Sequence, residues 1–367
     1  MPDREDIMKK FYSGFDILRT LFCALIVIHH FFSIMGWNLI GPDSALWPLV
    51  LHGGVMGVSF FFVLSGFCLA SGYRKRIPAG EVRFFDFFKK HYIRFFVFSA
   101  ITLLPMVLKQ YLVWKAGMDE MPTWRNILLD LFCIRTGYGF DYAFPYNSAL
   151  WYIDILLQMY IVYFAFAFFL GNFSRIVTVL ASALLSGAGL FIVLREGTEF
   201  WGTINVNGRG LYCFFAGVLL AEIFTWLEEH PRLKKVFVAI AIGAMIWTVC
   251  MIRTPLMTAR FNEIFTYSLW LPLIYVMTFA DISKVPYIGR FFHYTGKLSN
   301  SVYIWHHPII YIVYPLASLG KISVDWNSIP FTIGMMILIL AVSVFSMEVL
   351  EKYLFGRIFA EKKAAAD

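Results

Sequence analysis

Ten apolar stretches recur along this chain of 367 residues, each close to the ~20 residues that a helix needs to cross a bilayer. Hydrophobic residues make up 59% of the sequence and charged residues only 15%, a balance that soluble domains do not have. The sequence therefore predicts an all-α, polytopic membrane protein with about ten transmembrane helices, forming a single domain over residues 1–367. The stretches are, roughly, 16–36, 50–72, 92–113, 147–170, 175–194, 210–227, 234–252, 263–281, 299–319 and 329–350.

Positive charge predicts how these helices are oriented. With an even number of spans, the segments on the side of the N-terminus carry about 20 of the 31 Lys and Arg residues, which predicts that both termini are cytoplasmic. Orientation and anionic lipid then explain the net charge of +7, so no nucleic-acid partner is expected. The five cysteines have no metal-binding spacing, and no metal site is expected.

Two ionisable residues, Arg19 and His30, lie inside the first apolar stretch. They are eleven residues apart, so a helix of ~3.6 residues per turn would place both side chains on one face, about 16 Å apart along the axis. His29 would point roughly 80° away from Arg19. Ionisable groups within a transmembrane helix are costly and mark candidate functional sites.

A basic cluster, Arg74, Lys75 and Arg76, follows the second apolar stretch on the predicted cytoplasmic side, and Arg94 lies near the start of the third. Guanidinium and ammonium groups bind phosphates, so these residues are candidates to hold a phosphate-rich cofactor. An ordinary positive-inside loop would explain the same charges. Ser65, within the second stretch, is either a polar notch beside a ligand or part of a small-residue helix contact.

The fourth apolar stretch carries a carboxylate, Asp154, three residues after Trp151. Counted along the helices, Asp154 and His30 both lie roughly 10 Å below the outer ends of their spans. A carboxylate at that depth would orient the imidazole and stabilise its charged form. Pairing of Asp154 with an arginine is the alternative.

Two further regions combine polar and aromatic groups. The ninth stretch begins with LSNSVYIWHHPII (298–310), which brings Tyr303, His306 and His307 into the membrane as a second histidine pair. The longest loop, 114–146, is expected outside the cytoplasm, where its side chains either contact sugar or form an interfacial aromatic belt. These side chains are Trp124, Arg135, Tyr138, Asp141, Tyr142 and Tyr146.

Several motifs follow one another across nearly the whole chain. They are Asp16-x-x-Arg19-x10-His30, FFVLSGF at 61–67, a basic helix start ending at Arg94, LWY at 150–152, Arg209 in GRGLYCFFAG, and LSxSxYxWHxP at 298–308. Their order resembles the acyltransferase-3 family, integral membrane O-acyltransferases of bacterial cell-surface glycans, in the form without a fused extracytoplasmic domain. Two departures are the run WYIDILL at 151–157, where relatives often have Trp-x-Leu-Ser-x-Glu-Glu, and His91-x-x-Arg94 in place of Arg-x-x-Arg.

What the resemblance implies is transfer of an acyl group, usually acetyl, from cytoplasmic acetyl-CoA across the cell (inner) membrane to a hydroxyl of a glycan. On this interpretation His30 is the general base. Asp154 is expected to be its catalytic partner from its depth alone, since the family pattern places no carboxylate at that position. Trp151 and Arg209 are expected to bind the glycan. The residues expected to bind acyl-CoA are Arg19, Ser65, Arg74, Lys75, Arg76, Arg94, Tyr303 and His306.

Two alternatives stay open at this stage. A histidine could accept the acyl group before passing it on, in place of acting as a base. A glycan exporter or flippase would use the same intramembrane charges to line a path, although the inverted repeats typical of such proteins are not evident in the sequence. The acceptor glycan, the acyl chain and the oligomeric state are not determined by the sequence.

Overall fold

The computed structural model describes residues 13–36, 39–44, 46–138, 145–195, 203–251, 263 and 265–354. Within these ranges the regular secondary structure is helical, with no β-strand. Eight of the helices in the described ranges are long and apolar enough to cross a membrane. The all-α, polytopic architecture predicted from the sequence is therefore confirmed, while the orientation and the total of about ten spans stay predictions.

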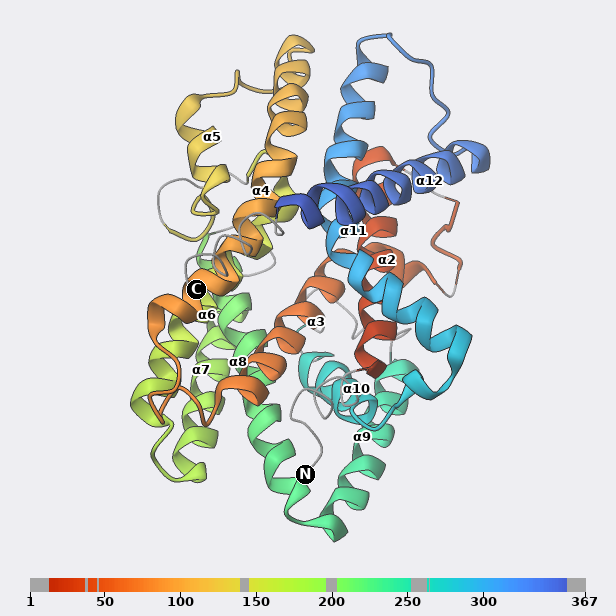
Figure 1. Cartoon of the computed structure of the whole chain (residues 1–367). Coiled ribbons are helices and arrows are strands. Elements are labelled where there is room, and N and C mark those ends of the chain that lie inside the picture. Colours follow the sequence, from red (N-terminus) through yellow and green to blue (C-terminus); the bar gives the residue numbers. More distant parts are fainter. Residues whose placement is uncertain are drawn as a thin grey trace. The chain divides into compact units, whose positions relative to one another are not determined.

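Most helices follow the predicted apolar stretches (Figure 1), but the helix of the ninth stretch begins at Pro286, thirteen residues before its predicted start. The third begins eight residues earlier than predicted, so Arg94 lies inside a helix and not at its start. The helices are α2 (Ser13–Met35), α3 (Trp47–Tyr73), α4 (Phe84–Lys115), α5 (Trp124–Leu131), α6 (Trp151–Leu170), α7 (Arg175–Arg195), α8 (Thr203–Glu228), α9 (Pro231–Met251), α10 (Leu271–Met277), α11 (Pro286–Ser318) and α12 (Ile329–Phe345). Short 3₁₀ segments, η1 (Ser148–Leu150) and η4 (Ile282–Lys284), and π-helical segments, η3 (Thr266–Trp270) and η5 (Ser346–Glu351), lie between or after them.

The chain divides into two compact units that interleave along the sequence. Unit 1 takes residues 1–22, 52–88 and 155–296, and unit 2 takes residues 23–51, 89–154 and 297–367. Neither unit is a continuous stretch of chain, because the sequence returns to each of them. That the whole chain acts as a single domain stays a prediction.

In unit 1, glycines allow α3 and α8 to touch through their main chains. A Cβ atom at Gly66 would lie 2.0 Å from the carbonyl oxygen of Phe214, and one at Gly217 would lie 2.0 Å from the carbonyl oxygen of Val63. Only residues without a side chain permit so close an approach, which is how small residues promote helix association in membranes. Small-residue packing therefore accounts for the glycine of the FFVLSGF motif. The pair α7 and α8 also lies side by side in this unit (Figure 1).

In unit 2, a hydrophobic core joins α2, the first turn of α3, α11 and α12, and α12 crosses α11 in Figure 1. Interlocking of apolar side chains, more than exclusion of water, stabilises helix contacts within a bilayer. This core fixes the second half of α2 against α11, the two helices that carry the paired histidines. Its buried members are Val27, Phe31, Met35, Val50, Ile309, Ile310, Met335 and Ile339.

Substitution of Gly66 by Ala should destabilise the protein, because the new methyl group would collide with a main-chain carbonyl that cannot rotate away. Overpacking of this kind typically costs about 1–3 kcal/mol, so the purified protein should unfold at a lower temperature in detergent. Gly72→Ala, on the same helix, is the matched control, because nothing lies within 4 Å of its Cβ position. Equal unfolding temperatures for the two variants would contradict the close approach of α3 and α8.

Candidate active site

Three histidines gather in unit 2. The ring of His30, on α2, lies 4.9 Å between centroids from that of His306 and 5.9 Å from that of His307, both on α11. His29 meets His30 edge-on at 5.4 Å. His306 and His307 are buried. The structure thus brings together two histidine pairs that lie 276 residues apart in sequence, measured from His30 to His306. Within the described residues no group of three or more His, Cys, Asp or Glu is arranged to hold a metal ion.

Main-chain carbonyls determine which nitrogen of each ring carries the proton. Nδ1 of His30 lies 2.9 Å from the oxygen of Ile26, and Nδ1 of His306 lies 3.2 Å from the oxygen of Val302, each four residues earlier on the same helix. A carbonyl oxygen only accepts hydrogen bonds, so each neutral ring is protonated at Nδ1 and has its lone pair at Nε2. Nε2 of His306, 3.3 Å from Nδ1 of His30, is then a second acceptor for that N–H. Among described residues His30 forms hydrogen bonds through Nδ1 alone, which leaves the lone pair of Nε2 open as a base.

The third imidazole of the cluster pairs with a serine. Nε2 of His307 is hydrogen-bonded to Oγ of Ser148, in η1. The ring of His307 stacks on Tyr311 with centroids 4.1 Å apart, and its Nδ1 is buried with no hydrogen-bond partner in the described part of the chain. The sequence analysis did not identify Ser148, because a serine just before LWY has no motif of its own and its partner is 159 residues away.

Hydrogen bonds to α11 hold the residues on either side of Ser148 in place. The amide Nδ2 of Asn147 donates to the carbonyl oxygen of Ile304 at 3.0 Å. The hydroxyl of Tyr303 donates to the carbonyl oxygen of Ala149 at 2.8 Å. Tyr303, expected to bind acyl-CoA, therefore contributes to the position of η1 in this structure.

A buried ion pair anchors the same segment to α5. Asp130 accepts hydrogen bonds from Nη1 of Arg135 at 3.2 Å and from the main-chain N–H of Tyr146 at 2.8 Å. Burial raises the pKa of Asp130 to about 6, although Arg135 and the Tyr146 N–H act in the opposite direction, so the carboxylate is ionised at neutral pH. Arg135 and Tyr146 are both buried, and neither the sugar contact nor the interfacial belt predicted for them holds. Trp124, 76% exposed, fits either, and Asp141 and Tyr142 lie outside the described residues.

The predicted catalytic carboxylate, Asp154, is 1% exposed at the start of α6. Its Oδ2 accepts a hydrogen bond from the main-chain N–H of Thr136 at 2.8 Å. The hydrogen bonds of His30 to described residues go to Ile26 and His306, so they do not include Asp154. Their partnership stays a prediction. Trp151, expected to bind the glycan, is buried one turn earlier on the same helix.

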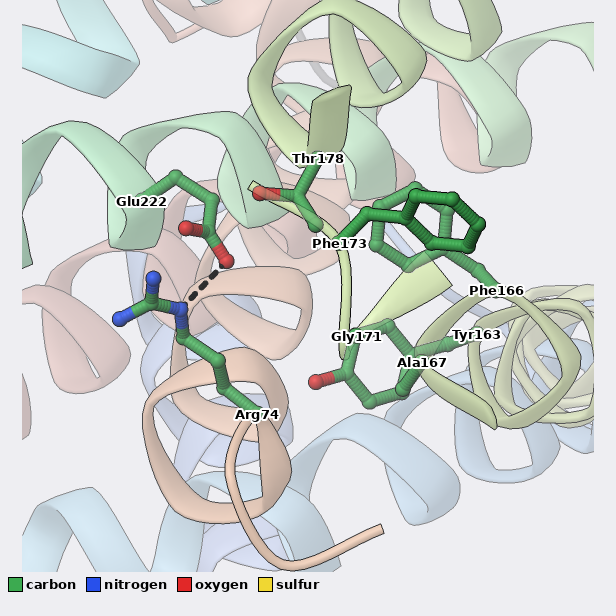
Figure 2. Close-up of a pocket in the computed structure, with 8 residues that line it drawn as sticks. All are labelled: Arg74, Tyr163, Phe166, Ala167, Gly171, Phe173, Thr178 and Glu222. Carbon is green, nitrogen blue, oxygen red and sulfur yellow. Dashed lines mark hydrogen bonds and ion pairs between the residues drawn. The ribbon is translucent and has the colours of Figure 1, made fainter. Parts of the chain in front are cut away.

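In unit 1, the predicted cofactor residue Arg74 lines a pocket between α3, α6, α7 and α8 (Figure 2). The pocket has about 330 Å³ of empty space, part of it open to solvent. Nε of Arg74 donates to Oε1 of the buried Glu222 at 2.7 Å, and the hydroxyl of Tyr163 points toward this ion pair. The ion pair uses Nε, and among the residues that the structure describes the two terminal nitrogens of Arg74 form no ion pair with a carboxylate.

The other predicted cofactor cations differ in how firmly they are held. Arg19 forms an ion pair with Asp16 at 3.3 Å and is 36% exposed. Lys75 and Arg76 are exposed after the end of α3. Arg94 is also exposed, with its guanidinium carbon 5.5 Å from the ring centre of Phe98 on its own helix. Ser65 is half-buried within α3. Whether these residues bind acyl-CoA stays a prediction.

The predicted glycan residue Arg209 forms a buried, two-pronged ion pair. Its Nη1 and Nη2 donate to the two carboxylate oxygens of Glu263 at 3.1 and 2.7 Å, and Nη1 also donates to Oγ of Ser59. A guanidinium whose acceptors lie within the protein serves first to hold α8, α3 and the η3 region together. Contact with a glycan stays a prediction. The sequence analysis did not identify Glu263, which lies 54 residues from its partner.

A family model for an acyltransferase domain, Acyl_transf_3, matches residues 12–348. The chain belongs to this family, and with its apolar helices it is a multi-pass membrane protein of the acyltransferase class. It is 24% identical over 353 residues to O-acetyltransferase OatA of Staphylococcus aureus strains NCTC 8325 and COL, a match that covers 86% of this chain and 54% of the relative. It is 22% identical over 357 residues to "Putative O-acetyltransferase SACOL0978" of strain COL, with 86% and 53% covered.

The chain thus spans about half the length of the curated relatives it matches. Comparison with solved structures found no match.

Replacement of His306 by Ala should lower acyl transfer about two- to tenfold, because His30 loses one acceptor worth ~0.5–1.5 kcal/mol while the carbonyl of Ile26 remains. If His306 positions His30, kcat falls and KM for acyl-CoA is unchanged; if His306 binds the donor, KM rises. Steady-state kinetics with acetyl-CoA separates the two. His230→Ala is the control, because His230 bonds the carbonyl of Trp226 in the same way but is exposed, follows the end of α8 and belongs to unit 1.

Proposed function

We propose that the protein transfers an acyl group, most simply acetyl, from cytoplasmic acyl-CoA to a hydroxyl of an extracytoplasmic glycan, within the bacterial cell (inner) membrane. Membership of an acyltransferase family supports acyl transfer, and the names of the relatives support O-acetylation. The observation that carries the proposal is the open Nε2 of His30 in a buried cluster of histidines.

The chemistry assigned to His30 is general-base catalysis. Its Nε2 takes the proton of the acceptor hydroxyl as the hydroxyl oxygen attacks the thioester carbonyl, and the thiolate of CoA leaves. The enclosed rings of His306 and His307 keep the surroundings of this base poor in water, which limits hydrolysis of the thioester. Asp154 is retained as a catalytic candidate because it is a buried carboxylate in the same unit.

Acyl-CoA is the donor we infer, because several of the available cations suit its phosphates. Exposed cations after α3 can reach a soluble cofactor without breaking a buried ion pair, and Arg74 lines a pocket while its ion pair with Glu222 uses only Nε. Three further residues are proposed to bind acyl-CoA only because they lie in motifs that resemble the family: Ser65, Tyr303 and His306. The cations are Arg19, Arg74, Lys75, Arg76 and Arg94.

A glycan hydroxyl is proposed as the acceptor on the same resemblance, with Trp151 and Arg209 as candidate contacts. Both side chains are buried, and Arg209 is paired with Glu263. In the proposed contact with the glycan, both side chains must therefore become accessible when the acceptor binds.

Release of CoA from acetyl-CoA by the purified protein tests the proposed function. His30→Ala should remain folded and reduce the steady-state rate of thiol release, measured with a hydroxyl acceptor present, ~10²–10⁴-fold, the usual contribution of a positioned base. His29→Ala is the matched control: its ring belongs to the same helix but bonds the carbonyl of Val50, and its removal should have little effect. Loss of activity in His29→Ala with His30→Ala unaffected would refute the assignment. Mass spectrometry of surface glycans from cells with and without the protein would identify the acceptor.

The donor assignment makes a separate prediction for Lys75→Ala combined with Arg76→Ala. This variant should raise KM for acetyl-CoA about tenfold or more at unchanged kcat, because contacts to non-reacting phosphates are equally strong before and during the reaction. The fold should survive, since Arg76 loses an exposed ion pair with Glu81 and a contact with the ring of Tyr73, both at the surface. Arg232→Ala removes another exposed cation from the same predicted side and is the control. Unchanged KM in the double variant would exclude these residues from the donor site.

A further inference from the structure

The histidine cluster contains a hydroxyl–imidazole pair that general-base catalysis by His30 does not use. Oγ of Ser148 and Nε2 of His307 are hydrogen-bonded, with the serine half-buried and the histidine 2% exposed. A serine hydroxyl is a weak nucleophile until a neighbouring base takes its proton, and a hydrogen-bonded serine and histidine is the structural signature of such activation. The pair is therefore equipped for covalent chemistry.

Packing does not account for the way His307 is placed. Its Nδ1 is enclosed without a hydrogen-bond partner in the described residues. An apolar aromatic ring at this position would stack on Tyr311 equally well and would leave no buried nitrogen unpaired. A buried polar atom left unpaired is costly and calls for an explanation, of which a catalytic role is one. No carboxylate holds Nδ1 within these residues, so the arrangement is a dyad and not a triad.

We propose that Ser148 carries the acyl group between donor and acceptor as an oxygen ester, with His307 as its base. This inference rests on the proposed function. In the first step Oγ attacks the thioester carbonyl, Nε2 of His307 takes the hydroxyl proton, the carbon–sulfur bond breaks and CoA leaves as the thiolate. In the second step Nε2 of His30 takes the proton of the acceptor hydroxyl, the acceptor oxygen attacks the ester, and the carbon–Oγ bond breaks as His307 returns its proton to Ser148.

The two steps balance through water: the released CoA thiolate takes a proton from solvent, and His30 gives the acceptor's proton back to solvent after the second step. The sum is thioester plus alcohol giving ester plus thiol. The geometry provides one imidazole for each step: the rings of His30 and His307 are 5.9 Å apart and nearly perpendicular, within one unit. A covalent intermediate also lets the donor leave before the acceptor binds, which suits reactants that reach the protein from opposite sides of a membrane.

The intermediate can be trapped by incubating the purified full chain with isotopically labelled acetyl-CoA and no acceptor, then quenching in acid and mapping peptides by mass spectrometry. We expect a labelled acetyl ester on Ser148 and a burst of CoA equal to the enzyme. Ser148→Ala and His307→Gln should lose both and slow CoA release at least about 100-fold. Ser343→Ala is the matched control, because that buried serine bonds only the carbonyl of Ile339 on its own helix.

Each outcome decides the proposal. Label on a histidine with none on Ser148, or full activity in Ser148→Ala, overturns the nucleophile and leaves the proposed acyltransferase function intact, since CoA release would still depend on His30. A wild-type protein that neither releases CoA nor takes up label overturns both. If Ser148→Ala does not fold, Ser148→Cys replaces it: a thioester at that position, cleaved by neutral hydroxylamine, supports the proposal, and its absence overturns it.

Discussion

Polar side chains within the apolar helices of this protein must find hydrogen-bond partners inside the protein, because hydrocarbon offers none. Main-chain carbonyls one turn earlier supply many of them: they accept from Ser182, Thr248 and Ser343 on three different helices. The histidines of the candidate site use the same device. The carbonyl of Ile26, which accepts a hydrogen bond from the ring of His30, also determines which ring nitrogen remains basic. The need for hydrogen-bond partners inside a bilayer thus sets the protonation of the proposed base.

Charged side chains divide into two groups by the same requirement. Arg209, Arg135 and Arg74 each pair with a buried carboxylate in their own unit, and removal of one partner from such a pair is strongly destabilising, typically by about 3–5 kcal/mol. Lys75 and Arg76 are exposed, and exposed ion pairs such as that of Arg76 with Glu81 contribute little to the fold. An exposed cation can bind a ligand at small cost to stability. A cation in a buried ion pair can bind a ligand only through nitrogens that the ion pair does not use.

The sequence supports the prediction of the helices and of the residues within them that carry chemistry, because both depend on local composition. Apolar stretches of the right length locate the long helices to within a few residues for most of the chain, and two histidine pairs inside such stretches stand out against their surroundings. Pairs formed across long sequence separations were not predictable. Glu263 and Ser148 look unremarkable in the sequence, and they acquire their roles only when α8 and α11 bring Arg209 and His307 to them. The early start of α4 was missed because its first turns are aromatic and basic, with no apolar periodicity to mark them.

The short helix α5 has one face that contacts the rest of the protein and one face that is exposed. Asp130, on the inner face, holds the segment that leads to Ser148, while Trp124 and Leu128 project into the surroundings. Changes on the outer face leave the anchor untouched, and changes on the inner face displace everything attached to it. The outer surface of α5 can therefore be altered without disturbing the anchor on which the position of Ser148 depends.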